Sequence, residues 1–149
     1  MKIQIISVGK IAGEQASLAK HYQKMTVWKI QNTELTYAKK LSENQIGQHE
    51  AKLIQNKITK GSYIIVLDLS GKQMTSEAFS DIFATQMMSG RNIDFIIGGA
   101  FGLDASILAL ADVKLCLSKM TFPHQIAKLL LFEQIYRAQT ILDKHPYHK

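Results

Sequence analysis

The stretch SYIIVLDL (residues 62–69) decides the fold. Its apolar side chains follow one another almost without a break, which is typical of a strand buried on both faces, as in a parallel sheet. We expect the turn that ends this strand at Ser70-Gly71-Lys72. Working outward, apolar patterning predicts four more strands, at 2–8, 26–35, 93–97 and 113–117.

Helical segments separate these strands. Caps, glycine stops and apolar spacing predict helices at about 13–25, 43–59 after Ser42, 75–89 before Gly90, 104–111 with Asp104 as its cap, and 123–143 beginning at Pro123. Strands alternating with helices at this spacing predict a single α/β domain, residues 1–149, built on a mostly parallel sheet. Ligands in such sheets bind beyond the carboxyl ends of strands, which directs attention to the segments after Leu69, Ile97 and Leu117.

The composition is that of an ordinary globular domain. The 149 residues are 46% hydrophobic and 20% charged, which is enough to bury a core and excludes disordered and collagen-like chains. No apolar run approaches the ~20 residues of a membrane-spanning helix, and the first residues lack the apolar region of a secretory signal. The one cysteine, Cys116, permits no internal disulfide, so we expect a cytoplasmic protein.

The positive charge of the chain is unevenly distributed. The formal net charge is +6, and residues 1–60 hold ten basic and four acidic side chains, whereas residues 61–149 hold eight of each. A basic half favours an anionic partner, for which a phosphate backbone is the commonest candidate. Solubility alone is the alternative explanation, so charge by itself does not decide for nucleic acid.

Two glycine-containing segments fail to match common nucleotide-binding motifs. Residues 9–13 (GKIAG) have the wrong spacing for a GxGxxG dinucleotide site, and residues 70–73 (SGKQ) lack the upstream glycine and the following hydroxyl of a phosphate loop. Nicotinamide dinucleotides, a standard Rossmann methyltransferase and nucleotide hydrolysis are therefore disfavoured. By contrast, IIGGAFGL (96–103) puts three glycines directly after a buried strand. There bare backbone either approaches a ligand or simply makes a tight turn.

Two segments near the C-terminus carry reactive side chains. LSKMTFPHQ (117–125) combines a strand end, two hydroxyls and His124 at a helix start, which together can line a pocket. HPYHK (145–149) places two imidazoles, a phenol and an amine behind a proline. The alternatives are a capping histidine for the first segment and a frayed polar tail for the second. Two histidines without cysteines or a carboxylate cluster are too few ligands for a metal, so we expect none.

The last predicted helix carries both polar and apolar signals. Arg137 follows Glu133 by one turn, so the two either form an ion pair or serve a site. Apolar side chains cover nearly every face of this helix, and a domain this small cannot easily surround it. We therefore expect part of the helix to meet a second copy of the chain in a homodimer. Cys116, inside a predicted buried strand, is expected to be an inert core thiol.

Five motifs occur in a fixed order along the chain: VLDLSGK (66–72), FIIGGAFGL (95–103), LSKMTFPHQ (117–125), FEQIYRA (132–138) and HPYHK (145–149). Together they resemble the SPOUT-class methyltransferases that modify pseudouridine in large-subunit ribosomal RNA, the ribosomal RNA large subunit methyltransferase H family. The resemblance covers the whole chain, but residues 13–44 match only in pattern. Ala100-Phe101 departs from the family pattern, which often has Pro or Ser followed by a polar residue.

The resemblance implies a homodimer with a C-terminal trefoil knot, in which the last helix threads a loop and the knot, within about 66–149, holds S-adenosylmethionine. It implies methylation of N3 of a pseudouridine in 23S ribosomal RNA or the assembled ribosome. Carried over by motif, the cofactor contacts fall on Leu67, Gly98, Leu117, Ser118, Lys119, Met120, Thr121 and Phe122.

The implied reaction requires an imide N–H to lose its proton, either to a general base or with help from donors that stabilise the anion. We rank Arg137, Tyr147 and His148 as catalytic residues and assign RNA contacts to His124, His145 and Lys149. The imidazoles of His124, His145 and His148 remain alternatives for the general base. Two non-enzymatic hypotheses also remain: a silent RNA-binding or ribosome-assembly module, and a small-molecule-binding α/β protein. The glycine-rich strand end beside the His, Tyr and Arg residues favours the enzyme.

Overall fold

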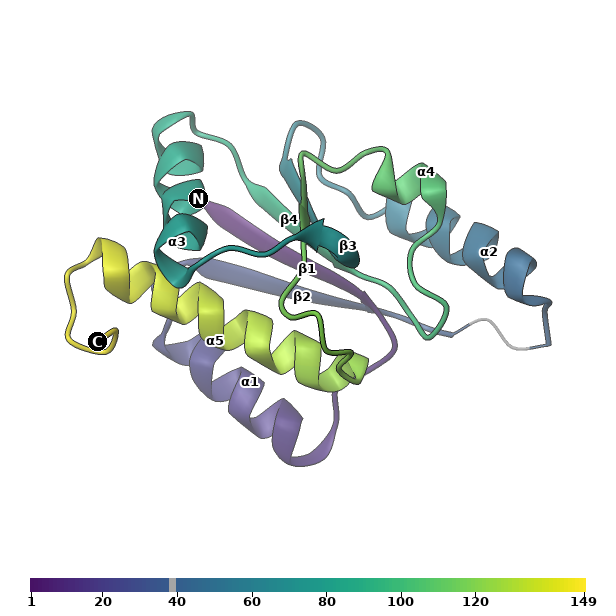
Figure 1. The fold of residues 1–149 in the computed structure, drawn as a ribbon, viewed down its shortest axis with the longest axis horizontal. Coiled ribbons are helices and arrows are strands. Elements are labelled where there is room, and N and C mark those ends of the chain that lie inside the picture. Colours follow the sequence, from purple (N-terminus) through teal and green to yellow (C-terminus); the bar gives the residue numbers. More distant parts are fainter. Residues whose placement is uncertain (38–39) are drawn as a thin grey trace.

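The chain is a five-stranded parallel sheet with helices on both faces (Figure 1). The structure is a computed structural model that describes residues 1–37 and 40–149. In chain order its elements are β1 (Lys2–Val8), α1 (Gly13–Met25), β2 (Lys29–Leu35), α2 (Glu43–Gln55), β3 (Tyr63–Lys72), α3 (Ser76–Met88), β4 (Ile93–Ile97), α4 (Ala105–Leu108), β5 (Val113–Leu115) and α5 (His124–Leu142). The strands lie in the order β2-β1-β4-β3-β5 and every pairing is parallel. The predicted α/β class is therefore confirmed.

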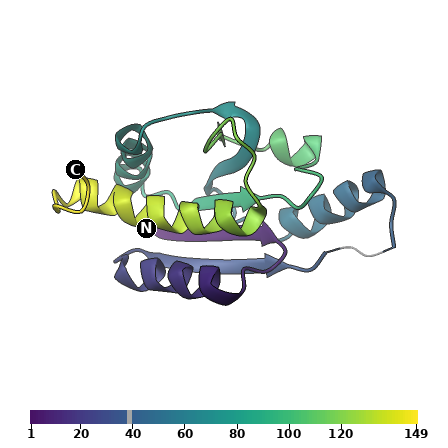
Figure 2. The same ribbon diagram turned by 60° about the horizontal axis from the view of Figure 1, so that its bottom comes forward.

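Each face of the sheet has its own helical layer. Helices α1, α3 and α5 cover one face and α2 and α4 the other (Figure 2). Because side chains alternate along a strand, Ile93, Phe95 and Ile97 of β4 point into the first layer, whereas Ile96 points into the second. The continuous apolar strands predicted from the sequence thus serve two cores at once.

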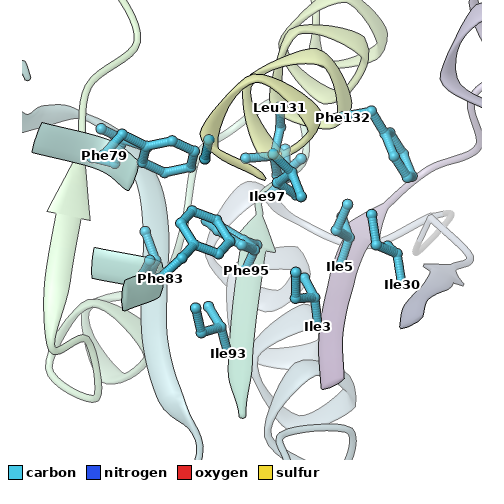
Figure 3. Packing of buried hydrophobic residues seen from close by; sticks show 14 of the residues in the cluster. Ile3, Ile5, Ile30, Phe79, Phe83, Ile93, Phe95, Ile97, Leu131 and Phe132 are labelled. Carbon is cyan, nitrogen blue, oxygen red and sulfur yellow. The ribbon is translucent and has the colours of Figure 1, made fainter. Parts of the chain in front are cut away.

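Aromatic rings pack against one another in the larger core, between the sheet and helices α3 and α5 (Figure 3). Phe83 is fully buried, stacks on Trp28 with ring centroids 4.8 Å apart, and meets Phe79 edge-on at 5.0 Å. Such offset and edge-to-face pairs add stability beyond the area they bury. They fix α3 against the sheet, and α3 in turn supports the C-terminal end of α5.

Helix α2 begins as predicted and ends earlier. Ser42 and Gln45 form a reciprocal capping box at its start. The helix stops at Gln55, not near Thr59, because the Thr59 backbone N–H donates to Asp94 Oδ2 at 2.6 Å instead of continuing the helical ladder. A contact with a distant strand therefore overrides the local helical pattern.

The expected turn at Ser70-Gly71-Lys72 is wrong, because β3 continues through Lys72. Beyond a register shift, the strand pairs again with β5, and Lys72 O accepts the Cys116 N–H at 3.1 Å. A Cβ on Gly71 would lie 2.6 Å from the carbonyl carbon of Lys114. The glycine thus permits a close approach of two strands and does not mark a turn.

The remaining boundaries differ from the predictions by a few residues. β2 begins at Lys29, α4 ends at Leu108, β5 ends at Leu115, and Pro123 caps α5 from just outside it. Helix α5 is buried on several sides, as expected, but α1, α3 and the sheet already supply much of that burial within one chain. The homodimer therefore stays a prediction. In the described part of the chain, no helix is both long and apolar enough to span a bilayer.

Candidate functional site

A cavity of about 460 Å³ lies where β4 and β5 end, beside residues 67–69 of β3, the strand between them in the sheet. Four segments line it: residues 67–69, residues 97–103 except Phe101, residues 115–118, and residues 120–124, with Ala127 on the first turn of α5. Its volume is within the range of small-molecule sites. The segments after Ile97 and Leu117, singled out from the sequence, therefore meet in one pocket, whereas β3 contributes residues 67–69 from within the strand and not the segment after Leu69.

The glycine loop after β4 forms one wall of this pocket. The Gly102 N–H donates to Gly99 O at 3.1 Å, and Gly102 has a φ of +76°, which closes a tight turn. A Cβ on Gly98 would lie 2.9 Å from the Gly102 carbonyl carbon and 3.0 Å from Leu103 Cγ. Only glycine fits at position 98 without moving the loop, so its bare backbone faces the cavity. The departure from the family pattern, Ala100-Phe101, lies at the loop's tip, with Phe101 exposed.

The loop between β5 and α5 forms another wall and is internally hydrogen-bonded. The buried Cys116 thiol donates to Ser118 O at 3.0 Å, and Ser118 Oγ accepts the Met120 N–H at 3.0 Å. Met120 stands at the rim, three-quarters exposed. The loop thus has a fixed backbone and a flexible apolar rim.

Seven of the eight residues carried over as cofactor contacts line this one cavity: Leu67, Gly98, Leu117, Ser118, Met120, Thr121 and Phe122. Lys119 lies on the same loop but outside the lining. His124, which we assigned to RNA, also lines the cavity, at the first turn of α5.

The three residues ranked as catalytic form a second cluster. Arg137 pairs with Glu133 at 2.6 Å, as one sequence interpretation allowed, and its Nη1 lies 3.3 Å from His148 Nδ1. Tyr147 donates to Glu133 Oε1 at 3.1 Å while its ring lies 4.8 Å from the guanidinium of Arg137. His148 Nε2 lies 2.8 Å from Glu77 Oε1 on α3. The C-terminal tail is therefore docked on α3 and α5, not frayed.

Electrostatics reinforce the docking of the tail. Hydrogen bonds from its own backbone N–H and from His148 lower the pKa of Glu77 to about 2. Burial, together with hydrogen bonds to Tyr22 and Glu133, raises the pKa of Tyr147, so its phenol keeps its proton at neutral pH. The other two residues assigned to RNA, His145 and Lys149, are exposed beside this cluster.

The cluster of Arg137, Tyr147 and His148 and the pocket lie toward opposite ends of α5. Figures 1 and 2 show the C-terminus of the chain and the start of α5 at opposite ends of this helix. Residue 124 begins the helix and Arg137 lies far along it, and at 1.5 Å per residue these positions are about 20 Å apart along the axis. One chain on its own therefore does not bring Arg137, Tyr147 and His148 to its own cavity. The motifs, which lie close together in sequence, gave no warning of this separation.

Three polar residues beside the pocket were missed by the sequence analysis. Lys128 is 1% exposed and bonds Ser7 and Glu34. Tyr37 contacts His124, and Glu50 is buried next to Gly99. A lysine within the apolar run of a buried helix was the one available signal, since buried lysines are almost always paired.

The fold and pocket define an α/β protein of the SPOUT methyltransferase class: a family model described as "Predicted SPOUT methyltransferase" matches residues 1–148. The Ribosomal RNA large subunit methyltransferase H of Ruminiclostridium cellulolyticum is 41% identical, and that of Clostridium botulinum strain Okra 42%, each over 100% of both chains. The chain belongs to the ribosomal RNA large subunit methyltransferase H family, which confirms the resemblance seen in the motifs.

Solved structures agree on the fold. A probable methylase family protein from Haemophilus influenzae Rd KW20 superposes with a TM-score of 0.58 at 13% identity, over 99% of this chain and 70% of that one. The SpoU methyltransferase AviRb from Streptomyces viridochromogenes, in complex with AdoMet, gives 0.51 at 10% identity, over 93% and 58%. Among the described residues there is no group of three or more His, Cys, Asp or Glu side chains suited to a metal.

Proposed function

We propose that this chain uses S-adenosylmethionine to methylate N3 of a pseudouridine in large-subunit ribosomal RNA. The observation that carries the proposal is the single cavity in which seven of the eight motif-derived cofactor residues meet. The names of the relatives, all at about 40% identity over the full chain, supply the substrate class. Such a substrate supports our expectation of a cytoplasmic protein.

The cavity fits this cofactor in size and chemistry. Bare backbone at Gly98 and Gly99 and in the 115–118 segment offers hydrogen-bonding groups to an adenosine, while Leu67, Leu117 and Phe122 offer apolar contact. When bound, S-adenosylmethionine supplies a sulfonium methyl group, which is already a strong electrophile. What the chain must add is orientation of the acceptor and removal of its proton.

The basic half of the chain supports an RNA partner. Lys40, Lys52 and Lys57 are exposed on or beside α2, where phosphate contacts would fix the orientation of the substrate. Lys39, which belongs to the same basic group in the sequence, lies outside the described residues. We assign His124 at the pocket, and His145 and Lys149 on the tail, as further RNA contacts.

We propose a homodimer in which each pocket receives the partner's tail, and a C-terminal knot in which α5 threads a loop within residues 66–149. The separation of about 20 Å along α5 within one chain supports the shared site. The pocket rim also exposes apolar side chains that a second copy would cover, with Leu69 60%, Phe101 58% and Met120 75% exposed. A two-fold axis would place two such sites in one dimer.

Calorimetric titration with S-adenosylmethionine, followed by methyl transfer to ribosomes, tests the proposed activity. We expect binding and one methyl group per acceptor. Binding to ribosomes without methyl transfer would instead favour a non-catalytic assembly module, and an absence of cofactor binding at millimolar concentration would overturn the proposal.

Mixed dimers test the shared site. Light scattering should first give the mass of two chains. One protomer would carry Gly98→Val, which fills the cofactor wall, and the other would lack Tyr147, His148 and Lys149. If tails serve the partner's pocket, one of the two sites keeps an intact pocket and an intact tail, so about half of the activity remains. If each tail serves its own pocket, both sites are defective and activity is lost.

A further inference from the structure

A second polar cluster lies beside the proposed cofactor pocket. It is found between β1 and β4, where the chain connections lead away in opposite directions along the sheet. From β1 the chain turns to its neighbour β2, whereas from β4 it crosses β3 to reach β5 on the other side. In open α/β sheets the carboxyl ends of two such strands flank a ligand crevice. Here the strand ends are Gly9 and the Gly98-Gly99 pair, and Tyr37, Glu50 and His124 surround them.

Glycine at position 9 makes room for Tyr37. A Cβ on Gly9 would lie 2.6 Å from Tyr37 Cζ, and Gly9 has a φ of +88°. The phenol ring therefore lies directly over the Gly9 backbone. From there its Oη reaches to 3.0 Å from His124 Nε2 and 3.3 Å from Nδ1, and the two rings meet edge-on with centroids 5.9 Å apart.

His124 is the pocket side chain best suited to accept a proton. Among the described residues, the titratable side chains that line the cavity are Asp68, Cys116 and His124. The Asp68 carboxylate already accepts the N–H and hydroxyl of Ser70, and the Cys116 thiol donates to a carbonyl. Imidazole is also the side chain whose ordinary protonation change falls near neutral pH.

We propose that His124 is the general base that removes the N3 proton of the acceptor nucleobase and that Tyr37 is the residue that positions it. This inference rests on the proposed function. In the step, the N3–H bond breaks and the proton goes to an imidazole nitrogen. The electron pair stays on N3 and forms the bond to the incoming methyl carbon, and the pair of the broken carbon–sulfur bond returns to sulfur.

The proposal uses one tautomer of His124. Burial, and the nearby carboxylate of Glu50, raise the pKa of Tyr37, so the phenol stays protonated. In the tautomer that carries the proton on Nε2, the nearer nitrogen, the phenol oxygen accepts that N–H and the lone pair of Nδ1 serves the substrate. Glu50 is 5% exposed, and its carboxylate lies 3.1 Å from where a Cβ of Gly99 would be.

The other charged groups near the His124 imidazole lie on β3, on α5 and on β2. Asp68 lies within β3, and Lys128 lies one turn along α5. The Lys128 ammonium is paired with Glu34 of β2. Burial lowers the pKa of Lys128 in spite of that pairing, and Lys128 is directed away from the pocket toward Ser7.

The test is single-turnover methyl transfer to ribosomes, at saturating cofactor, across about two pH units on either side of neutral. His124→Gln keeps a polar side chain but cannot accept the proton, and His21→Gln, an exposed histidine on α1, is the matched control. We expect His124→Gln to lose at least ~100-fold at neutral pH while cofactor affinity by calorimetry stays unchanged. The loss should shrink as pH rises, because the imide then ionises unaided, and added imidazole should restore part of the rate in His124→Ala.

Tyr37→Phe tests the positioning role, because it keeps the ring over Gly9 and removes only the hydroxyl. We expect a loss of about tenfold, the effect of one neutral hydrogen bond, with an altered pH profile and no further loss when it is combined with His124→Gln. A His124→Gln rate within threefold of wild type, or a loss that is constant with pH, would overturn the assignment of the base. Wild-type protein that binds cofactor but transfers no methyl group would overturn the proposed function as well.

Discussion

The buried ion pair between α5 and β2 predicts an asymmetric response to removal of its two partners. Lys128 is 1% exposed, and its Nζ lies 2.7 Å from Glu34 Oε1 and 2.8 Å from Ser7 Oγ. The Glu34 side chain is 22% exposed and also accepts the Ile11 N–H at 3.1 Å. The ammonium therefore depends on Glu34 much more than Glu34 depends on the ammonium.

The magnitudes follow from this difference. Glu34→Gln leaves a buried charge with only neutral acceptors, and removal of one partner from a buried pair costs about 3–5 kcal/mol. Lys128→Met puts an apolar chain of similar length in the same space and leaves Glu34 partly hydrated and bonded to Ile11. Replacement of a buried charge by a well-packed apolar side chain is often neutral, so we expect a change within about 1 kcal/mol. The pKa of Lys128 supports this expectation that the charge contributes little net stability, because burial lowers the pKa more than the pairing with Glu34 raises it.

The pH dependence has a defined sign. Burial raises the pKa of Glu34, but hydrogen bonds from Lys128 and Ile11 outweigh burial and leave it below its usual value. Its contribution to stability is therefore present above the ordinary glutamate pKa and is lost as pH falls through the lowered one. The stability of Glu34→Gln should therefore not show this fall at acid pH.

Urea unfolding followed by circular dichroism measures both effects. With a slope of ~2 kcal/mol per molar, Glu34→Gln should lower the midpoint by about 1.5 M or more at pH 7, and Lys128→Met by less than about 0.5 M. Equal losses in the two variants, or a larger loss in Lys128→Met, would refute the argument that the ammonium is the dependent partner.

Three further outcomes can be measured. Gly98→Ala should weaken S-adenosylmethionine binding, measured by calorimetry, by roughly 5- to 150-fold, since its Cβ would lie 2.9 Å from Gly102 and overpacking costs about 1–3 kcal/mol. In the control Gly47→Ala, whose Cβ meets nothing closer than 3.8 Å, the affinity for S-adenosylmethionine should be unchanged. Asp94→Asn should stabilise the fold at pH 8 by about 1–2 kcal/mol, because Asp94 Oδ1 is buried without a partner among the described residues. Burial raises the pKa of Asp94, so wild-type stability should fall as pH rises through that pKa, and thermal unfolding of the variant should not show this fall. Lys52→Glu with Lys57→Glu should weaken RNA binding and flatten its salt dependence without changing cofactor affinity, and an equal loss of both would show that these lysines support the fold.

Local patterns predicted the elements whose boundaries depend on local forces. β1, α1 and β4 begin and end where apolar periodicity places them, and the Ser42 cap forms as expected. Where the predicted boundaries of strands and helices were wrong, long-range contacts set the observed ones. Gly71 resembles a turn residue in the sequence, yet it serves the approach of β3 to β5, and Thr59 leaves the helical pattern to bond Asp94.

The pocket proposed for the cofactor was predictable for a different reason. Two of its walls follow the ends of β4 and β5, and β3 lies between these strands. A parallel sheet brings such ends together whatever the side chains are. The cluster around Tyr37 was not predictable, because Tyr37 and His124 are 87 residues apart and neither lies in a pattern that implies the other. The order of the strands, which places β1 beside β4, is what brings them together.

The docked tail bears on how two protomers would share a site. Its side chains are held by Glu77 on α3 and by Glu133 on α5, so the cluster is formed before any partner arrives. A partner's pocket would therefore meet a preformed surface and would not have to order a loose segment, which reduces the entropic cost of association. In this arrangement His124 belongs to the pocket and His148 to the partner's tail. The two imidazoles then have different environments and different roles, since His148 is bound to Glu77 and His124 lines the cavity.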